Sequence, residues 1–164
     1  MVQFQERRRY GRSQAERIAS LQALQLAWTR SPTRVMLVDC IPDEQSMYTE
    51  YLAHAGLAPV VVCESSAAFQ LAASAPPEVV VIDLGTNPED MLGLLQQFRA
   101  DRRTRGAAVI AISGHVFPKD QAEAFRAGCD VFLPKPCLPE TLLAEILRSL
   151  HGLKAGSLRR PSTP

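Results

Sequence analysis

Five short apolar runs recur along the chain, and segments of mixed polarity separate them. Each run is rich in β-branched residues and is continuous, instead of alternating between apolar and polar positions. This pattern is typical of parallel strands that helices cover on both faces. The runs, which we predict to be strands, are RVMLVD (34–39), APVVVC (58–63), EVVVID (78–83), AAVIAIS (107–113) and DVFLP (130–134).

The intervening segments carry apolar residues three or four positions apart, which predicts a crossover helix after each strand. Gly56, Gly106 and Gly128 fall at or shortly after the ends of the first, third and fourth helices, where a left-handed cap is favoured. Five strand–helix units in series predict an α/β fold with a doubly wound, open, five-stranded parallel sheet. The apolar positions of the expected helices are Met47, Tyr51, Leu52 and Ala55; Phe69, Ala72 and Ala73; Leu92, Leu95 and Phe98; Ala122 and Phe125; and Leu143, Ile146, Leu147 and Leu150.

Polar side chains stand at the carboxyl ends of four of these strands. Asp39 ends the first strand, Asp83 the third and Ser113 the fourth, and Lys135 follows the fifth. A single aspartate after an apolar run would be interpreted as a simple strand end. Since ligands of open α/β sheets bind outside the carboxyl ends of the strands, four polar groups there predict a functional site at that edge.

Composition limits the number of domains and the kinds of partner. With 164 residues, 46% of them hydrophobic, the chain can form one core but is too short for two ordinary domains. The net charge is +1, yet residues 1–33 hold six arginines and two glutamates, and residues 152–164 hold three basic residues and no acid, which leaves residues 34–151 acidic. The cluster Arg7–Arg9 lacks interleaved aromatic residues, so we interpret it as a solvated tail and expect no nucleic-acid partner.

The cysteines and the hydropathy pattern bear on cell compartment. The chain has four cysteines without a CxxC pair, and its three histidines are not at zinc-ligand spacing from them, so we expect reduced, mostly buried thiols. No apolar run approaches the roughly 20 residues of a membrane-spanning helix, and the start of the chain lacks the apolar stretch of a signal peptide. We therefore expect a cytoplasmic protein with no membrane contact.

Four blocks in order, at particular spacings, resemble the receiver domains of two-component response regulators. They are VDCIPD (38–43), VVVIDLG (79–85), VIAISGH (109–115) and VFLPKP (131–136). The resemblance covers about residues 34–151 and implies the flavodoxin-like strand order 2-1-3-4-5. It also implies a signalling protein of a phosphorelay and not an enzyme. Asp83 would accept a phosphoryl group from a histidine kinase or a phosphotransfer protein.

The resemblance assigns roles to the other residues at the sheet edge. Mg²⁺ would be held by Asp39, Asp83 and the backbone carbonyl of Gly85, and would neutralise charge on the phosphoryl oxygens. Lys135 would pair with those oxygens, and the hydroxyl of Ser113 would hydrogen-bond one of them. Phe132 stands at the family's switch-aromatic position, where it is either a switching residue or a plain core aromatic.

The chain departs from the family pattern beside the first of these aspartates. The family has two adjacent acids there, but in this chain Cys40 occupies the position of the second acid. A thiol is a poor ligand for a hard cation. Asp43 and Glu44 begin the next helix and are expected to point elsewhere, so the sequence predicts weak magnesium binding. In the loop LGTNPEDMLG (84–93), Gly93 also comes later than the corresponding glycine of the family. This predicts that the loop covering the site has a different shape.

Two functions therefore stay open: a stand-alone phosphoacceptor receiver, and a degenerate pseudo-receiver that acts by protein contact without phosphate chemistry. An FMN carrier is disfavoured, because CIPDEQS (40–46) has no glycine and two acids where a phosphate-binding loop would lie.

The two ends of the chain lie outside the resemblance. Residues 1–33 form a basic extension in which residues 13–31 are expected to be helical, with an apolar stripe that packs on its own domain or forms a homodimer or partner contact. Residues 152–164 are expected to be a disordered basic tail, too short for an output domain. The output would then be a contact with a downstream protein. The stripe consists of Ile18, Leu21, Leu24 and Trp28.

Overall fold

Five parallel strands form one sheet in the order β2-β1-β3-β4-β5. The structure is a computed structural model that describes residues 33–154. The predicted helix at 13–31 and residues 155–164 of the predicted tail lie outside the described residues, whereas residues 152–154 of that tail belong to the last helix. The strands are β1 (Val35–Val38), β2 (Val60–Val62), β3 (Val79–Asp83), β4 (Ala108–Ser113) and β5 (Val131–Pro134); the helices are α3 (Pro42–His54), α4 (Ser65–Ser74), α5 (Pro88–Ala100), α6 (Pro118–Ala127) and α7 (Pro139–Lys154). The predicted fold class is confirmed.

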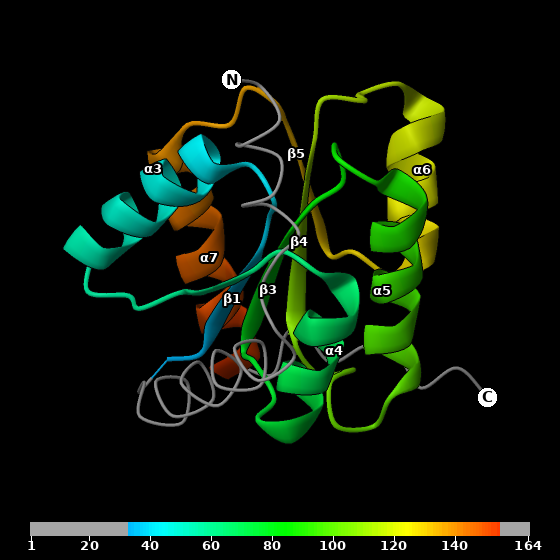
Figure 1. Cartoon of the computed structure of the whole chain (residues 1–164), viewed down its shortest axis with the longest axis horizontal. Coiled ribbons are helices and arrows are strands. Elements are labelled where there is room, and N and C mark those ends of the chain that lie inside the picture. Colours follow the sequence, from blue (N-terminus) through cyan, green and yellow to red (C-terminus); the bar gives the residue numbers. More distant parts are fainter. Residues whose placement is uncertain (1–32, 155–164) are drawn as a thin grey trace, which may run out of the picture.

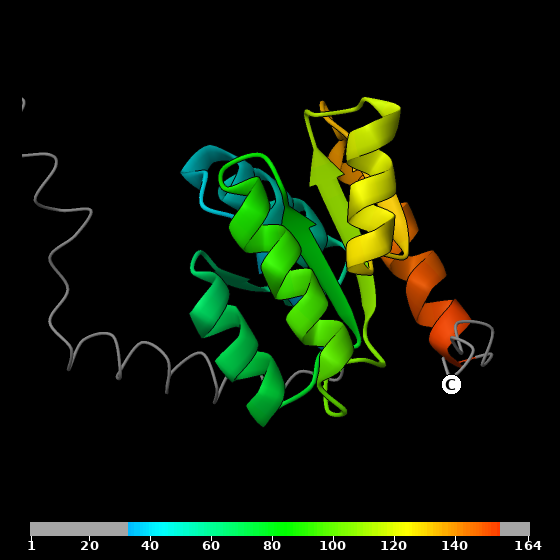
Figure 2. The ribbon, with the colours of Figure 1, turned by 90° about the vertical axis from the view of Figure 1, so that its right-hand side faces the viewer.

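The helices form one layer on each face of the sheet. Figure 1 shows α3 and α7 on one side of the strands and α4, α5 and α6 on the other, and Figure 2 shows the latter three side by side. Strand side chains alternate between the two layers, since Met36 and Val38 pack toward one and Val35 and Leu37 toward the other. Both strand faces are therefore buried, which explains the continuous apolar runs.

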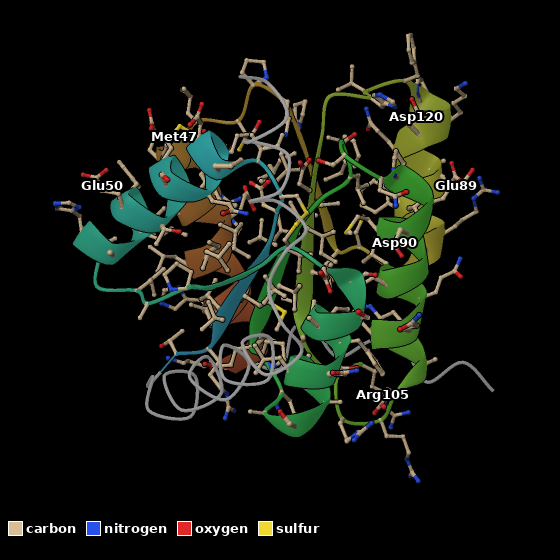
Figure 3. The ribbon with its side chains drawn as sticks, viewed as in Figure 1. Met47, Glu50, Glu89, Asp90, Arg105 and Asp120 are labelled. Atoms are coloured by element: carbon tan, nitrogen blue, oxygen red, sulfur yellow. A yellow bond between two sulfur atoms is a disulfide. The ribbon has the colours of Figure 1, made fainter. Side chains whose placement is uncertain are left out.

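The spacing of buried helical residues was predicted correctly, but their positions were partly wrong. On α3, Leu52 is buried as predicted, while Tyr51 is 39% exposed and its neighbour Tyr48 is buried. Met47 lies on the outer side of α3, as does Glu50 (Figure 3). On α6, Phe125 is 48% exposed and the inner face consists of alanines. A helical period does not set the rotation of a helix about its axis, because packing against the sheet selects the inner face.

Two of the three predicted glycine caps are confirmed. Gly56 has φ +80° and Gly128 has φ +119°, both in the left-handed region. Gly106 is wrong as a cap, because α5 ends at Ala100 and a turn follows it before Gly106 is reached. A Cβ atom on Gly128 would lie 2.5 Å from Cγ of Arg99, so close packing adds to the requirement for glycine.

Arg99, in the last turn of α5, joins that helix to the start of two strands. Its Nε donates to the carbonyl oxygen of Gly128 at 2.8 Å, and a terminal nitrogen donates to that of Ala107 at 2.7 Å. Its other terminal nitrogen pairs with Oδ2 of Asp130 at 2.6 Å. The same oxygen of Asp130 accepts the backbone N–H of Val109 at 2.8 Å. This network lies at the amino ends of β4 and β5, opposite the sheet edge at which the strands end.

Candidate functional site

Asp83 is the last residue of β3, between β1 and β4 at the centre of the sheet, and only 5% of it is exposed. The carboxyl ends of the strands point to one edge, the upper edge in Figure 2. Oδ1 of Asp83 accepts the backbone N–H of Gly85 at 2.9 Å. A Cβ atom on Gly85 would lie 3.1 Å from that same oxygen, so the absence of a side chain permits this approach. Oδ2 is buried and accepts no hydrogen bond from the described residues.

Lys135 lies beside this carboxylate, as the sequence predicted. Its Nζ is 3.2 Å from Oδ2 of Asp83, within ion-pair range although the contact lacks hydrogen-bond geometry. Its backbone N–H donates to the carbonyl oxygen of Ser113 at 2.8 Å, which anchors the residue beyond the end of β5. Burial alone would lower the pKa of Lys135, but the hydrogen bond to Glu44 and the negative charges of Asp83 and Glu44 outweigh it and raise that pKa. Lys135 therefore stays protonated.

Asp39 follows β1 and is 3% exposed. Its Oδ1 accepts the backbone N–H of Ile41 at 2.8 Å. Burial raises the pKa of Asp39, and the negative charges of Asp83 and Glu44 raise it further, against the opposing effects of the Ile41 N–H and Lys135. A buried carboxylate that has two carboxylate neighbours is costly to ionise unless a cation comes to it.

Glu44 is a site residue that was not predicted from the sequence. It was expected to point elsewhere, but its Oε2 accepts a hydrogen bond from Nζ of Lys135 at 2.6 Å. Carboxylate oxygens of Asp39, Glu44 and Asp83 all lie within 4.8 Å of one another. Glu44 precedes Tyr48 by four residues, and positions four apart share one face of a helix. Had Tyr48 been recognised as the buried tyrosine, Glu44 would have been placed above it, facing the site. Asp43 is exposed, as expected.

Cys40 forms a disulfide with Cys63, which corrects the expectation that all the thiols are reduced. The Cα atoms of the pair are 4.6 Å apart. Val38 and Val62 are paired in register on neighbouring strands, so the residues just beyond them lie side by side. Without the strand order, the sequence spacing of 23 residues gives no sign of this contact. Cys129 and Cys137 are buried and form no disulfide, as predicted.

Ser113 and Phe132 lie on the other side of Asp83 and line a shared pocket with Leu84 and His115. Ser113 ends β4 and is 3% exposed, and its Oγ accepts the backbone N–H of His115 at 3.0 Å. Phe132 is partly buried and packs against the core. The phosphate-binding and switching roles of these two residues stay predictions, as does metal binding by the carbonyl of Gly85.

The residues around Asp83 fit a hard divalent cation. The cluster offers carboxylate oxygens, the donor type that Mg²⁺ prefers, and the buried Oδ2 of Asp83 accepts no hydrogen bond from the described residues. The sulfur of Cys40 is held in the disulfide and does not compete as a soft ligand. A cation here would relieve the repulsion among the three carboxylates.

The chain is similar to known proteins over most of the described residues. A family described as the response regulator receiver domain matches residues 35–147. The response regulator Rre1 of Synechocystis is 28% identical over 127 residues, which cover 77% of this chain and 55% of the relative. The transcriptional regulatory protein BaeR of Escherichia coli is 22% identical, over 74% of this chain and 49% of its own length. The chain thus spans about half the length of these curated relatives.

Solved structures agree on the fold. A CheY-like receiver domain protein from Methanospirillum hungatei superposes with a TM-score of 0.68 at 18% identity, covering 76% of this chain and 98% of the other. The signal receiver domain of a histidine kinase from Syntrophus aciditrophicus has a TM-score of 0.67 at 20% identity, with 80% and 97% covered. Within residues 33–154, every helix is too short or too polar to cross a membrane.

Proposed function

Because this chain belongs to the response regulator receiver domain family, we propose that it accepts a phosphoryl group on Asp83 from a histidine kinase or a phosphotransfer protein. The observation that carries the proposal is the buried Oδ2 of Asp83, which accepts no hydrogen bond from the described residues and lies 3.2 Å from Nζ of Lys135. Such an oxygen is available as a nucleophile, and the neighbouring ammonium group stabilises the charge of an incoming phosphoryl group.

In the proposed reaction, a carboxylate oxygen of Asp83 attacks the phosphorus of a phosphohistidine. The new P–O bond forms as the P–N bond breaks, and the imidazole leaves with the electron pair and takes up a proton. Mg²⁺, when bound, neutralises charge on the phosphoryl oxygens. The ammonium group of Lys135 then moves from Glu44 toward those oxygens, and the hydroxyl of Ser113 donates a hydrogen bond to one of them.

We also propose that Glu44 supplies the carboxylate that is missing because Cys40 stands at the position of the family's second acid. Asp39, Asp83, Glu44 and the carbonyl of Gly85 would hold the cation. The proximity of the three carboxylates, within 4.8 Å, supports this assignment. Glu44 lies in the first turn of α3 and would have to break its hydrogen bond with Lys135 in order to bind the cation. Weak magnesium binding therefore stays a prediction.

Signal output is proposed to be a contact with a downstream protein. Phosphorylation adds charge and strong acceptors beside Ser113, and Phe132 shares the pocket that Ser113 lines. A change at Ser113 would therefore repack the pocket between β4, β5 and the start of α6.

The test is labelling of Asp83 by acetyl phosphate, measured as intact mass over a magnesium series. We expect a slow phosphoryl adduct on the full chain that needs high magnesium, and none on Asp83→Asn. Glu44→Gln should raise the magnesium needed for half-maximal labelling about tenfold, because the number of charged ligands sets affinity for the cation. Asp43→Asn is the matched control, because it removes the same charge from the neighbouring residue, whose side chain is exposed.

Cys40→Asp restores the second acid and also removes the Cys40–Cys63 disulfide. It should label faster than the natural chain and faster than Cys63→Ser, which removes the disulfide alone. An adduct on Cys40→Asp, together with none on the natural chain at any magnesium concentration, would reject the phosphoacceptor function and leave a pseudo-receiver. Equal effects of Glu44→Gln and Asp43→Asn would reject the role of Glu44 alone.

A further inference from the structure

The disulfide between Cys40 and Cys63 lies at the same edge of the sheet as the acidic site, directly after Asp39. Cys40 is partly buried and Cys63 is exposed, so a small molecule in solution can reach the bond. The two remaining cysteines, Cys129 and Cys137, are buried. Among the described residues, the cysteine sulfurs that solvent can reach therefore lie at one place, beside the site.

The bond joins the two loops that leave β1 and β2. Cys63 lies two residues before α4 begins at Ser65, and Cys40 lies two residues before α3 begins at Pro42. The backbone N–H of Asp39 donates to the carbonyl oxygen of Val62 at 3.1 Å. The disulfide extends this pairing of the two strands by one covalent link.

Besides the disulfide, hydrogen bonds hold the start of α3, among them those from the Ile41 N–H to Asp39 Oδ1 and from Nζ of Lys135 to Oε2 of Glu44. Ile41, its N-cap residue, makes no capping hydrogen bond with its side chain. The side chain of Gln45 donates to the carbonyl oxygen of Asp39, and the first helical bond runs from the N–H of Gln45 to the carbonyl oxygen of Ile41 at 2.9 Å. Glu44 lies within this same turn, so anything that fixes Cys40 also restricts Glu44.

We propose that the Cys40–Cys63 bond is a reversible modification site for low-molecular-weight thiols and disulfides, and that the bond holds the first turn of α3 so that Glu44 is presented to the acidic cluster. Coupling to magnesium rests on the proposed function, whereas the exchange chemistry and the ordering of α3 do not.

The exchange balances as two steps. A thiolate of the small thiol attacks Sγ of Cys63, a mixed disulfide forms, and Cys40 leaves and takes up a proton. A second small thiolate attacks the small-molecule sulfur of the mixed disulfide, and Cys63 leaves and takes up a proton. The protein gains two electrons and two protons, and the small thiols become one disulfide. A small disulfide acting in the reverse direction restores the bond.

Reduction should weaken magnesium binding. In the oxidised chain the start of α3 is already ordered, whereas the reduced chain must order this turn when Glu44 engages the cation. Ordering one side chain and its loop corresponds to a loss of affinity of about threefold to tenfold.

The first measurement is the redox equilibrium of the full chain in glutathione buffers of varied ratio, followed by alkylation under denaturing conditions and intact mass. We expect a cooperative change between two and four alkylated cysteines, because Cys129 and Cys137 are not part of the disulfide. The proposal is overturned if Cys40 and Cys63 stay reduced, or carry only glutathione adducts, even in excess glutathione disulfide. It is likewise overturned if excess dithiothreitol leaves the native bond intact.

The second measurement compares oxidised and reduced chains by amide hydrogen exchange over residues 41–47 and by calorimetric titration with magnesium chloride. Reduction should speed exchange in that turn and weaken the affinity, and Cys63→Ser, kept reduced, should match the reduced natural chain. Unchanged exchange in the turn would overturn the ordering role. Faster exchange without any magnesium binding in either state would instead count against the proposed function and leave the crosslink standing.

Discussion

At the scale of single residues, three carboxylates share one lysine in a largely buried site. Lys135 is hydrogen-bonded to Glu44 and ion-paired with Asp83, so Asp39 receives only part of its charge. Burial raises the pKa of Asp39, and the negative charges of Asp83 and Glu44 raise it further, against the smaller opposing effect of Lys135. Without a cation, ionised Asp39 is therefore a destabilising group, retained at a cost to the stability of the fold.

Asp39→Asn should stabilise the fold in the absence of magnesium. A raised pKa in the folded state means that the folded chain binds the proton more tightly than the unfolded chain, so the natural chain loses stability as pH rises above about 4. Asparagine keeps an oxygen for the Ile41 N–H and carries no charge. Thermal unfolding in EDTA at pH 7 should show a gain of about 1–3 kcal/mol, the size of close carboxylate repulsion.

The gain should shrink when the pH is lowered below about 4, where Asp39 is protonated in both states. Saturating magnesium should remove or reverse it, since the cation then favours the charged residue. A gain of the same size at pH 3.5 and pH 7 would show that electrostatic repulsion is not its cause.

At the scale of elements, one partly buried arginine bonds the end of α5 to the two strands beside it. The side chains of Arg99 and Asp130 are only 13% and 16% exposed, and between them they bond backbone groups of Ala107, Gly128 and Val109. These bonds hold the end of α5 against the start of β4 and β5. The starts of these two strands lie at the lower edge of the sheet in Figure 2, opposite the carboxyl ends that carry the acidic site.

Arg99→Met should lower the free energy of unfolding by about 2–4 kcal/mol, because the carboxylate of Asp130 loses its cation in a partly buried position. The measurement is urea unfolding. Arg103→Met is the matched control: Arg103 pairs with Asp101 through a side chain that is 58% exposed, and exposed pairs contribute little. If both variants lost stability equally, burial of the Arg99 pair would not be what makes it important.

At the scale of the whole molecule, the extension 1–33 precedes a domain in which helices already cover both faces of the sheet. The predicted stripe Ile18, Leu21, Leu24 and Trp28 would be a large apolar patch if nothing covered it. We expect it to pack on its own domain or on a second copy of the chain.

Light scattering on the full chain and on a chain that begins at Arg34 separates these outcomes. A dimer that becomes a monomer on shortening indicates a contact between copies. Two monomers, with shielded Trp28 fluorescence and a less stable shortened chain, indicate packing within one chain. Two monomers with Trp28 fluorescing as a water-exposed residue would contradict both.

The apolar pattern of the sequence by itself determined the strands and the alternation of strands with helices. Parallel strands all end at one edge, so the polar residues after those runs were bound to meet there, and Asp39, Asp83 and Lys135 do meet. The order of the strands came from the resemblance of four sequence blocks to receiver domains, and the structure confirms it. These features follow from local residue patterns and from the direction of each strand.

Contacts between elements far apart in the chain were decided only by the tertiary structure. The rotation of α3 that buries Tyr48 and turns Glu44 toward Lys135 depends on how that helix packs on the sheet and on α7, which a helical period does not specify. Cys40 and Cys63 are neighbours only because β2 pairs with β1, and 23 residues of intervening sequence conceal this. Neither the place of Glu44 in the site nor the disulfide could therefore be predicted from the sequence, because each depends on a partner that only packing brings within reach.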